Sequence, residues 1–148
     1  DNKGTSFIIN AIDKLLSEGH RIKFLLCENI PHNVLKQKYK ECDIFIDQVL
    51  GGYGTAAIEA MAIGRPTISY LRDVHFNELT IPGGIPIISA HRDNIYDVLK
   101  KTIENKHMLT DIGMQSRQFV ERNHDVKVLT KRLIGYYKML HNIKSLKH

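Results

Sequence analysis

The chain has 148 residues, of which 43% are hydrophobic and 25% charged, a composition typical of one globular domain with its own core. No stretch approaches about 18 apolar residues and no charged-then-apolar leader opens the chain, so we expect neither a membrane span nor a signal peptide. The net charge of +5 and the pI near 9.2 favour an anionic partner such as a diphosphate, a lipid head group or nucleic acid. Mild basicity without any partner is the alternative.

The two cysteines, Cys27 and Cys42, stand at the end of one predicted strand and just before another. We interpret them as free thiols of a cytosolic protein, with a disulfide or a metal role as the alternative. The eight histidines show no spacing typical of a metal site, so no metal is expected.

The first third of the chain predicts a helix, a strand and a second helix. The first helix has an apolar stripe from Ile8 to Leu16, with Thr5 or Ser6 as its cap, and it ends at Gly19. Arg21–Glu28 is predicted as a strand, because its continuous apolar run is typical of a parallel strand covered on both faces. Pro31 begins the next helix, which carries Val34, Leu35 and Tyr39. The chain has no initiator methionine, so we expect it to be part of a larger protein.

A βαβ unit follows in the middle of the chain. Its strands are Asp43–Asp47 and Thr67–Leu71, and its helix is Thr55–Ile63, which Gly64 ends. A glycine-rich turn at Gly51, Gly52 and Gly54 joins the first strand to the helix. Glycines before a helix N-terminus let backbone N–H groups approach an anion, although glycines alone are also common in simple turns.

The last part of the chain predicts a loop, a strand and three helices. Their ranges are Leu71–Gly84, Ile85–Ser89, Asn94–Glu104, His107–Asn123 and Val126–Lys144. Strands that alternate with helices predict an α/β fold, a doubly wound parallel sheet whose ligands bind beyond the carboxyl ends of the strands. The loop 48–54 and Arg72 would lie at that edge.

Glu59 is the only charged residue on a helix that is apolar on every side. An ionised carboxylate in such a place costs several kcal/mol unless hydrogen-bond donors surround it. Two kinds of partner fit: a neighbouring Arg, Lys or backbone amide, or a ligand diol, which supplies two matched donors. The sequence leaves both open.

The same residues resemble a known family. Tyr53-Gly54, Ile58-Glu59-Ala60-Met61-Ala62 and Gly64-Arg65-Pro66-Thr67-Ile68 are similar to the G…EAMA.G.PVI signature of group 1 glycosyltransferases of the GT-B fold, in the branch that also reads DQ, here Asp47 and Gln48. The resemblance extends to Lys3-Gly4-Thr5, Tyr70-Leu71-Arg72 and the stretch Phe119 to Asp125. It covers nearly the whole chain.

The resemblance implies a Rossmann-like domain over residues 1–148, the C-terminal, donor-binding half of a GT-B enzyme, with the N-terminal acceptor domain and the first strand absent. It implies that Glu59 holds the donor ribose and that Lys3 neutralises the donor diphosphate, while Gly52, Tyr53 and Gly54 bring backbone amides near the donor. We add Arg72 as a candidate for a donor phosphate or carboxylate, with a surface ion pair as the alternative.

One departure from the family pattern concerns donor positioning. Gly51 stands eight positions before Glu59, where the family's motif has its first glutamate, which contacts the donor sugar. Asp47 or Gln48 is the candidate replacement, and a simple capping role of Asp47 at the strand end is the alternative.

The activity implied is transfer of a hexosyl group from a UDP- or GDP-linked sugar to an acceptor hydroxyl with retention, in polysaccharide or glycolipid synthesis, without a metal or other cofactor. The expected location is cytoplasmic, with peripheral contact at the inner face of the membrane as a further option, and no nucleic acid partner is expected. The isolated domain is predicted to bind nucleotide weakly and to transfer nothing. The rival hypotheses are a nucleotide-sugar epimerase-like enzyme and a non-catalytic interaction module.

Two features near the C-terminus can be interpreted in more than one way. The final helix is amphipathic and basic, and it could pack on its own domain, lie on a membrane surface or dock on the absent domain. His124 beside Asp125 is interpreted as a helix junction in which Asp125 caps the last helix, rather than as a catalytic dyad.

Overall fold

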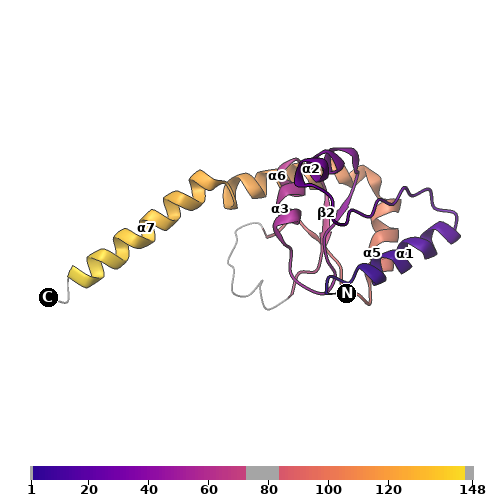
Figure 1. The fold of residues 1–148 in the computed structure, drawn as a ribbon, viewed down its shortest axis with the longest axis horizontal. Helices are drawn as coiled ribbons and strands as arrows, with labels where there is room; N and C mark the ends of the chain where they lie inside the picture. The colour runs from indigo at the N-terminus through magenta and orange to yellow at the C-terminus, as the bar shows by residue number, and fades with distance from the viewer. Residues whose placement is uncertain (1, 73–83, 146–148) are drawn as a thin grey trace.

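A computed structural model describes residues 2–72 and 84–145 of the chain, with side chains as far as residue 142 (Figure 1). Its elements in order are α1 (Thr5–Ser17), α2 (His32–Glu41), β1 (Phe45–Ile46), α3 (Thr55–Ala62), β2 (Thr67–Ser69), β3 (Ile88–Ser89), α5 (Ile95–Glu104), the 3-10 turn η1 (Lys106–Met108), α6 (Leu109–Asn123) and α7 (Val126–Ser145).

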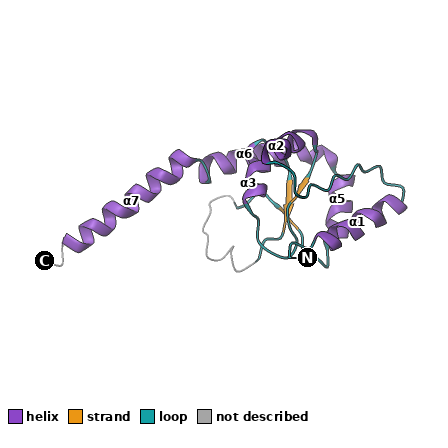
Figure 2. Cartoon of the chain, viewed as in Figure 1, coloured by secondary structure: helices purple, strands orange, loops and turns teal. Residues whose placement is uncertain are grey.

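The described strands form a small parallel sheet in the order β1-β2-β3 (Figure 2). Phe45 lies opposite Thr67, and Ile68 lies opposite Ile88. Backbone pairing continues just beyond the strands, because the Tyr70 N–H donates to the Gln48 carbonyl at 2.9 Å. The expected α/β class with parallel strands is therefore confirmed at this coarse level.

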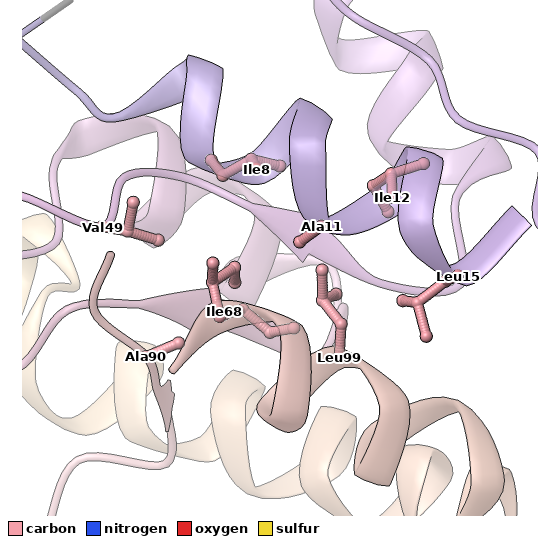
Figure 3. Packing of buried hydrophobic residues seen from close by; sticks show 9 residues of the cluster. Ile8, Ala11, Ile12, Leu15, Val49, Ile68, Ala90 and Leu99 are labelled. Carbon is pink, nitrogen blue, oxygen red and sulfur yellow. The ribbon is translucent and has the colours of Figure 1, made fainter. Parts of the chain in front are cut away.

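Helices cover both faces of this sheet. On one face α1 packs against α5, and their side chains meet Ile68 of β2 in a buried cluster (Figure 3). That cluster consists of Ile8, Ala11, Ile12, Leu15, Val49, Ile68, Ala90, Ile95 and Leu99. On the other face α3 packs against α6 around a second cluster of Met61, Leu71, Ile87, Phe119 and Val120.

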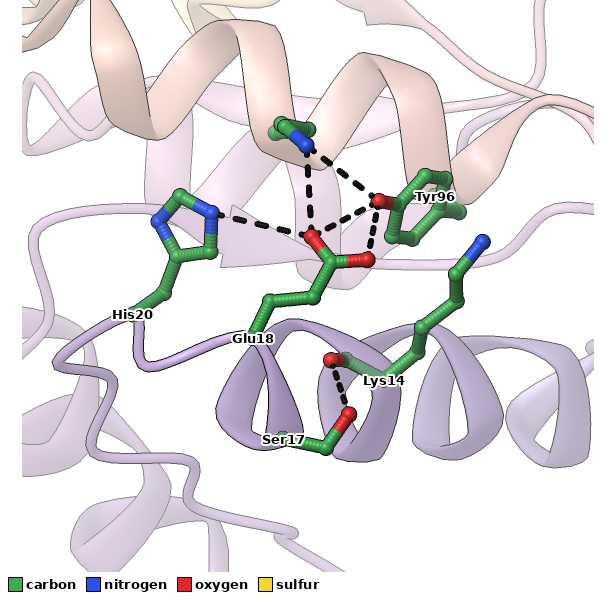
Figure 4. Close-up of polar contacts among 6 residues, drawn as sticks. Lys14, Ser17, Glu18, His20 and Tyr96 are labelled. Atoms are coloured by element: carbon green, nitrogen blue, oxygen red, sulfur yellow. Dashed lines mark hydrogen bonds and ion pairs between the residues drawn. The ribbon is translucent and has the colours of Figure 1, made fainter.

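A polar cluster fastens the C-terminal end of α1 to α5 (Figure 4). The Tyr96 hydroxyl donates to the Glu18 carboxylate, with distances of 2.6 and 2.8 Å to its two oxygens, and Lys100 adds an ion pair at 3.2 Å. The hydrogen bond from Tyr96, followed by Lys100, lowers the pKa of Glu18. Lys14 lies 3.7 Å above the ring of Tyr96, a cation–π contact.

The predicted helices are confirmed with small shifts at their ends. Gly19 and Gly64, the predicted stops of α1 and α3, have φ of 88° and 76°, where glycine is favoured. The cap of α1 differs from expectation, since Gly4 with φ of 80° takes the N-cap position in place of Thr5 or Ser6. The predicted helix 107–123 begins with the turn η1 before α6.

The predicted strand Arg21–Glu28 is not a strand. No backbone hydrogen bond of these residues to another described residue exists, and Leu25 and Leu26 are about half exposed, at 50% and 49%. Ile22 and Phe24 still pack against the cluster under α1. The apolar run has the composition of a strand, but a strand exists only where a neighbouring strand accepts and donates its hydrogen bonds.

The three remaining strands are all shorter than predicted: β1 covers Phe45–Ile46 of the expected 43–47, β2 covers Thr67–Ser69 of the expected 67–71, and β3 covers Ile88–Ser89 of the expected 85–89. Within the expected loop 71–84, residues 73–83 lie outside the described part of the chain.

The final helix does not pack on its own domain, so that alternative is wrong. Helix α7 extends away from the body of the molecule (Figure 1), and eight of its large apolar side chains, from Val126 to Leu140, are 45% to 71% exposed. Its first turn is held as predicted, because the Asp125 carboxylate accepts the Lys127 N–H at 2.8 Å. Among the helices of the described ranges, none is long and apolar enough to cross a membrane.

We predict that Gly113→Ala destabilises the fold by about 1 to 3 kcal/mol, because the new Cβ would lie 2.2 Å from the Gly64 carbonyl, a backbone atom that cannot move away easily. The matched control is Gly135→Ala, where a Cβ meets nothing within 4 Å. Urea unfolding monitored by circular dichroism measures both. Equal midpoints for the two variants would contradict the close approach of α3 and α6.

Candidate functional site

The candidate residues gather at the carboxyl edge of the parallel sheet. Asp47 and Gln48 follow β1, Tyr70 and Arg72 follow β2, and His91 follows β3. The rings of Tyr70 and His91 meet edge to face with centroids 5.9 Å apart, so the segments that leave β2 and β3 are in contact. Arg72 is exposed at this edge and is the last residue described before the gap at 73–83.

Glu59 on α3 has its partners on α2. His32 Nε2 lies 2.8 Å from Glu59 Oε1, and the Tyr39 hydroxyl donates to Oε2 at 3.4 Å. The Glu59 side chain is 28% exposed and that of His32 is 58% exposed, so the pair is accessible from solvent. Within residues 2–72 and 84–142, neither an Arg nor a Lys pairs with Glu59.

Sequence reasoning missed His32 and Tyr39 as partners of Glu59. A signal was present, because residues seven apart lie on one face of a helix, and His32 and Tyr39 satisfy that spacing on α2. The spacing alone does not indicate which face of α2 contacts α3.

Asp47 and Gln48 fold the glycine loop back onto the end of β1. The Asp47 carboxylate accepts the Gly54 N–H at 2.7 Å, and the Gln48 side-chain amide donates to the Gly52 carbonyl. Gly54 is the N-cap residue of α3, so Asp47 fixes the position at which this helix begins. One oxygen of the Asp47 carboxylate is therefore already engaged in a hydrogen bond within the loop.

The loop glycines do not need the left-handed backbone region, since none of Gly51, Gly52 and Gly54 has a positive φ. A Cβ at Gly54 would lie 3.4 Å from Asp47 Oδ2, whereas a Cβ at Gly52 would meet nothing within 4 Å. Open space at Gly52 therefore lets a ligand approach the backbone of the loop.

Lys3 is tied to this edge through its backbone. The Val49 N–H donates to the Lys3 carbonyl at 2.9 Å, and Gly4 lies so close that an added Cβ would be 2.5 Å from Val49 Cγ2. The Lys3 side chain is exposed. The predicted lysine and the predicted loop are thus brought together.

Tyr53 connects the loop to the junction of α6 and α7. Its ring meets the ring of His124 edge to face at 6.2 Å, and His124 also lies 5.5 Å from Phe119. His124 Nε2 is buried and has no hydrogen-bond partner among the described residues. Burial, followed by the charge of Arg132, lowers the pKa of His124.

A cavity of about 1310 Å³ touches only part of this edge. Lys3 and Asp47 contribute to its lining, while Glu59 and the glycine loop do not. Most of the candidate site therefore lies outside this cavity. No cluster of three or more His, Cys, Asp or Glu side chains suited to a metal ion occurs in the part of the chain that the structure describes.

Comparisons with protein-family models, with curated proteins and with solved structures give no match to this chain. The glycosyltransferase assignment therefore stays a prediction from the motifs.

We predict that Tyr39 is among the last tyrosines to ionise. Burial, followed by the nearby charge of Glu59, raises the pKa of Tyr39 to about 12, against about 10 in an unfolded chain. Because the folded protein keeps this proton longer, Tyr39 makes stability fall as the pH rises from about 10 to about 12. Absorbance titration of tyrosinate should lose its highest step in Tyr39→Phe. The control Tyr137→Phe, at a residue that is 63% exposed, should keep this highest step. Loss of a step near pH 10 in Tyr39→Phe would contradict the buried contact.

We also predict that His124 makes stability fall as the pH drops. Its pKa is lowered in the folded state, so the unfolded chain binds a proton first as the pH falls below about 7. Replacing His124 by Phe should flatten the difference in unfolding free energy between pH 7 and pH 5. The unsubstituted protein, measured at the same two pH values, is the reference. A slope unaltered in His124→Phe would show that the imidazole is not desolvated.

Proposed function

We propose that this chain is the donor-binding domain of a retaining hexosyltransferase, with a Rossmann-like sheet as the C-terminal half of a GT-B architecture. The observation that carries the proposal is the convergence of Lys3, the loop 51–54 and the N-terminus of α3 at one edge of the sheet. These groups come from segments about fifty residues apart and share one chemistry, the binding of an anion.

A nucleoside diphosphate sugar suits this edge in two ways. The first-turn N–H groups of α3 and the ammonium group of Lys3 supply positive charge for the diphosphate, and the departing nucleotide needs the same groups during transfer. Open space at Gly52 leaves room for the phosphates to approach the backbone.

Glu59 can serve the ribose while it keeps its contacts with α2. A carboxylate has about four acceptor positions, and His32 and Tyr39 use one on each oxygen. The remaining positions can accept two hydroxyl groups of a diol. His32 and Tyr39 then orient Glu59 for the ligand.

A second candidate is a non-catalytic domain on the same fold. It is favoured by the fact that Glu59 already has two partners inside the protein, and by Gly51 at the position of the first glutamate. In that case the contact of Glu59 with His32 joins α2 to α3, and Glu59 binds no ligand.

We propose two partners, a second domain of the same protein and a membrane surface. Hexosyl transfer needs an acceptor site facing the donor edge, which a second domain of the same protein would supply. The exposed apolar side chains of α7 suit docking on such a domain, and its lysines also suit a cytoplasmic membrane surface with anionic lipids. We propose a cytoplasmic location for the domain on these grounds.

Calorimetric titration with UDP, GDP and ADP tests the function. We predict that one nucleotide binds and that Glu59→Gln and Lys3→Ala each weaken its binding about tenfold or more, equivalent to about 1.4 kcal/mol. Glu104→Gln and Lys101→Ala, exposed changes on α5, are the matched controls and should leave binding unchanged. The chain alone should transfer no sugar.

Unfolding of the same variants separates the two candidates. If no nucleotide binds and Glu59→Gln only lowers the unfolding midpoint, the donor-binding proposal fails and the non-catalytic domain takes its place. Detectable transfer by the 148-residue chain would contradict the need for a second domain.

A further inference from the structure

The glycine loop 51–54 has one side chain with which to pack. Three of its four residues are glycines, and the fourth is Tyr53. The side chains of Asp47 and Gln48 hold two backbone groups of the loop from outside. The ring of Tyr53 is partly buried against the apolar cluster between α3 and α6. The position of the loop therefore depends on what this ring contacts.

The ring of Tyr53 contacts the imidazole of His124, the residue that follows α6. The two rings meet edge to face, with centroids 6.2 Å apart and an interplanar angle of 87°. The ring of Phe119 on α6 lies 5.5 Å from the same imidazole. Burial raises the pKa of the Tyr53 phenol. The imidazole thus joins a ring of the loop to a ring of α6.

The backbone at His124 is fixed by the junction between α6 and α7 (Figure 1). The His124 N–H donates to the Val120 carbonyl at 2.7 Å, and the Asp125 N–H donates to the same carbonyl at 3.1 Å. Across the junction the Arg132 side chain donates to the Arg122 carbonyl at 3.1 Å. A change at His124 therefore acts through its imidazole.

The imidazole of His124 is poorly placed to carry a charge. Its Nε2 is buried and has no hydrogen-bond partner in the part of the chain that the structure describes. A protonated imidazole donates from both nitrogens, so a buried nitrogen without an acceptor is unfavourable for the cation. Burial, followed by the positive charge of Arg132, lowers the pKa of His124. The structure therefore favours the neutral imidazole.

The ionisable groups around His124 come from three elements. The loop contributes the phenol of Tyr53, and α6 contributes Arg122, whose side chain is bonded within its own helix. The start of α7 contributes Arg132 and Asp125, and the carboxylate of Asp125 caps that helix. Among the described residues none of these groups is bonded to Nε2. A proton on the imidazole would therefore find no partner in its present position.

We propose that His124 positions the glycine loop 51–54 through the ring of Tyr53 while its imidazole is neutral, and that a proton taken up from water by the imidazole releases the loop. The cation turns toward water, where both of its N–H groups find acceptors, and Tyr53 loses the ring beside it. This inference concerns the loop itself and does not depend on the proposed function.

The test is a pH titration of the full chain by nuclear magnetic resonance, from about pH 8 to about pH 5, a range that brackets the ordinary histidine pKa of about 6.5. The Cε1 proton of His124 reports protonation of the imidazole, and the amides of Gly52 and Tyr53 report the loop. Gly54 is left out, because its N–H bonds directly to the carboxylate of Asp47.

The loop amides should shift with the same midpoint as the imidazole of His124, and the magnetisation transfer between the rings of His124 and Tyr53 should be lost at the acid end. His124→Phe keeps a ring and cannot take up a proton, so its loop amides should not follow this titration. His124→Ala should show the acid-form loop signals already at pH 8. The matched control is His141→Phe, an exposed change on α7 that should leave the loop titration as it is.

Three results would each overturn the proposal. The first is protonation of His124 without a shift of the loop amides, and the second is the same loop titration in His124→Phe. The third is unfolding of the whole chain together with protonation of His124, because the proton would then release the fold and not the loop. If His124→Ala does not fold, the titrations of the unsubstituted chain and of His124→Phe decide the question.

Discussion

Strand β2 is buried completely, because α1 and α5 cover one face of the sheet and α3 and α6 cover the other, and its polar groups must therefore find partners inside the protein. The Ser69 hydroxyl donates to the Gln48 carbonyl at 3.1 Å, and the Thr67 hydroxyl donates to the Arg65 carbonyl at 3.1 Å. The bond from Ser69 joins β2 to the segment that leaves β1. Burial of the central strand thus also fixes where the glycine loop begins.

The loop and Glu59 depend on this arrangement for their geometry. Asp47 holds the Gly54 N–H, so α3 starts at a defined place, and Glu59 follows one turn later beside α2. A carboxylate that is 28% exposed and retains free acceptor positions can stabilise the fold and bind a diol at once. The structural and the functional interpretation of Glu59, which are alternatives in the sequence, are therefore compatible in the structure.

The sequence predicted what depends on local pattern and missed what depends on distant partners. Apolar periodicity and the glycines at 19 and 64 were sufficient for α1 and α3, because a helix satisfies its own backbone hydrogen bonds. Residues 21–28 failed as a strand because their bonding partners must come from elsewhere in space. Glu59 is 27 residues from His32 and 20 residues from Tyr39 in the sequence. Periodicity relates residues within one helix, so it does not predict these contacts between two helices. The same holds for α7, whose apolar face was predicted while its exposure was not.

Lys3 links the backbone at the end of β1 to the candidate site. The Lys3 carbonyl accepts the Val49 N–H, while the Lys3 side chain is exposed. This hydrogen bond fixes the backbone of Lys3 and so reduces the freedom that the residue loses when it meets an anion. Binding free energy is gained when such ordering precedes the ligand. An anion at this edge would therefore meet a lysine whose backbone folding has already ordered.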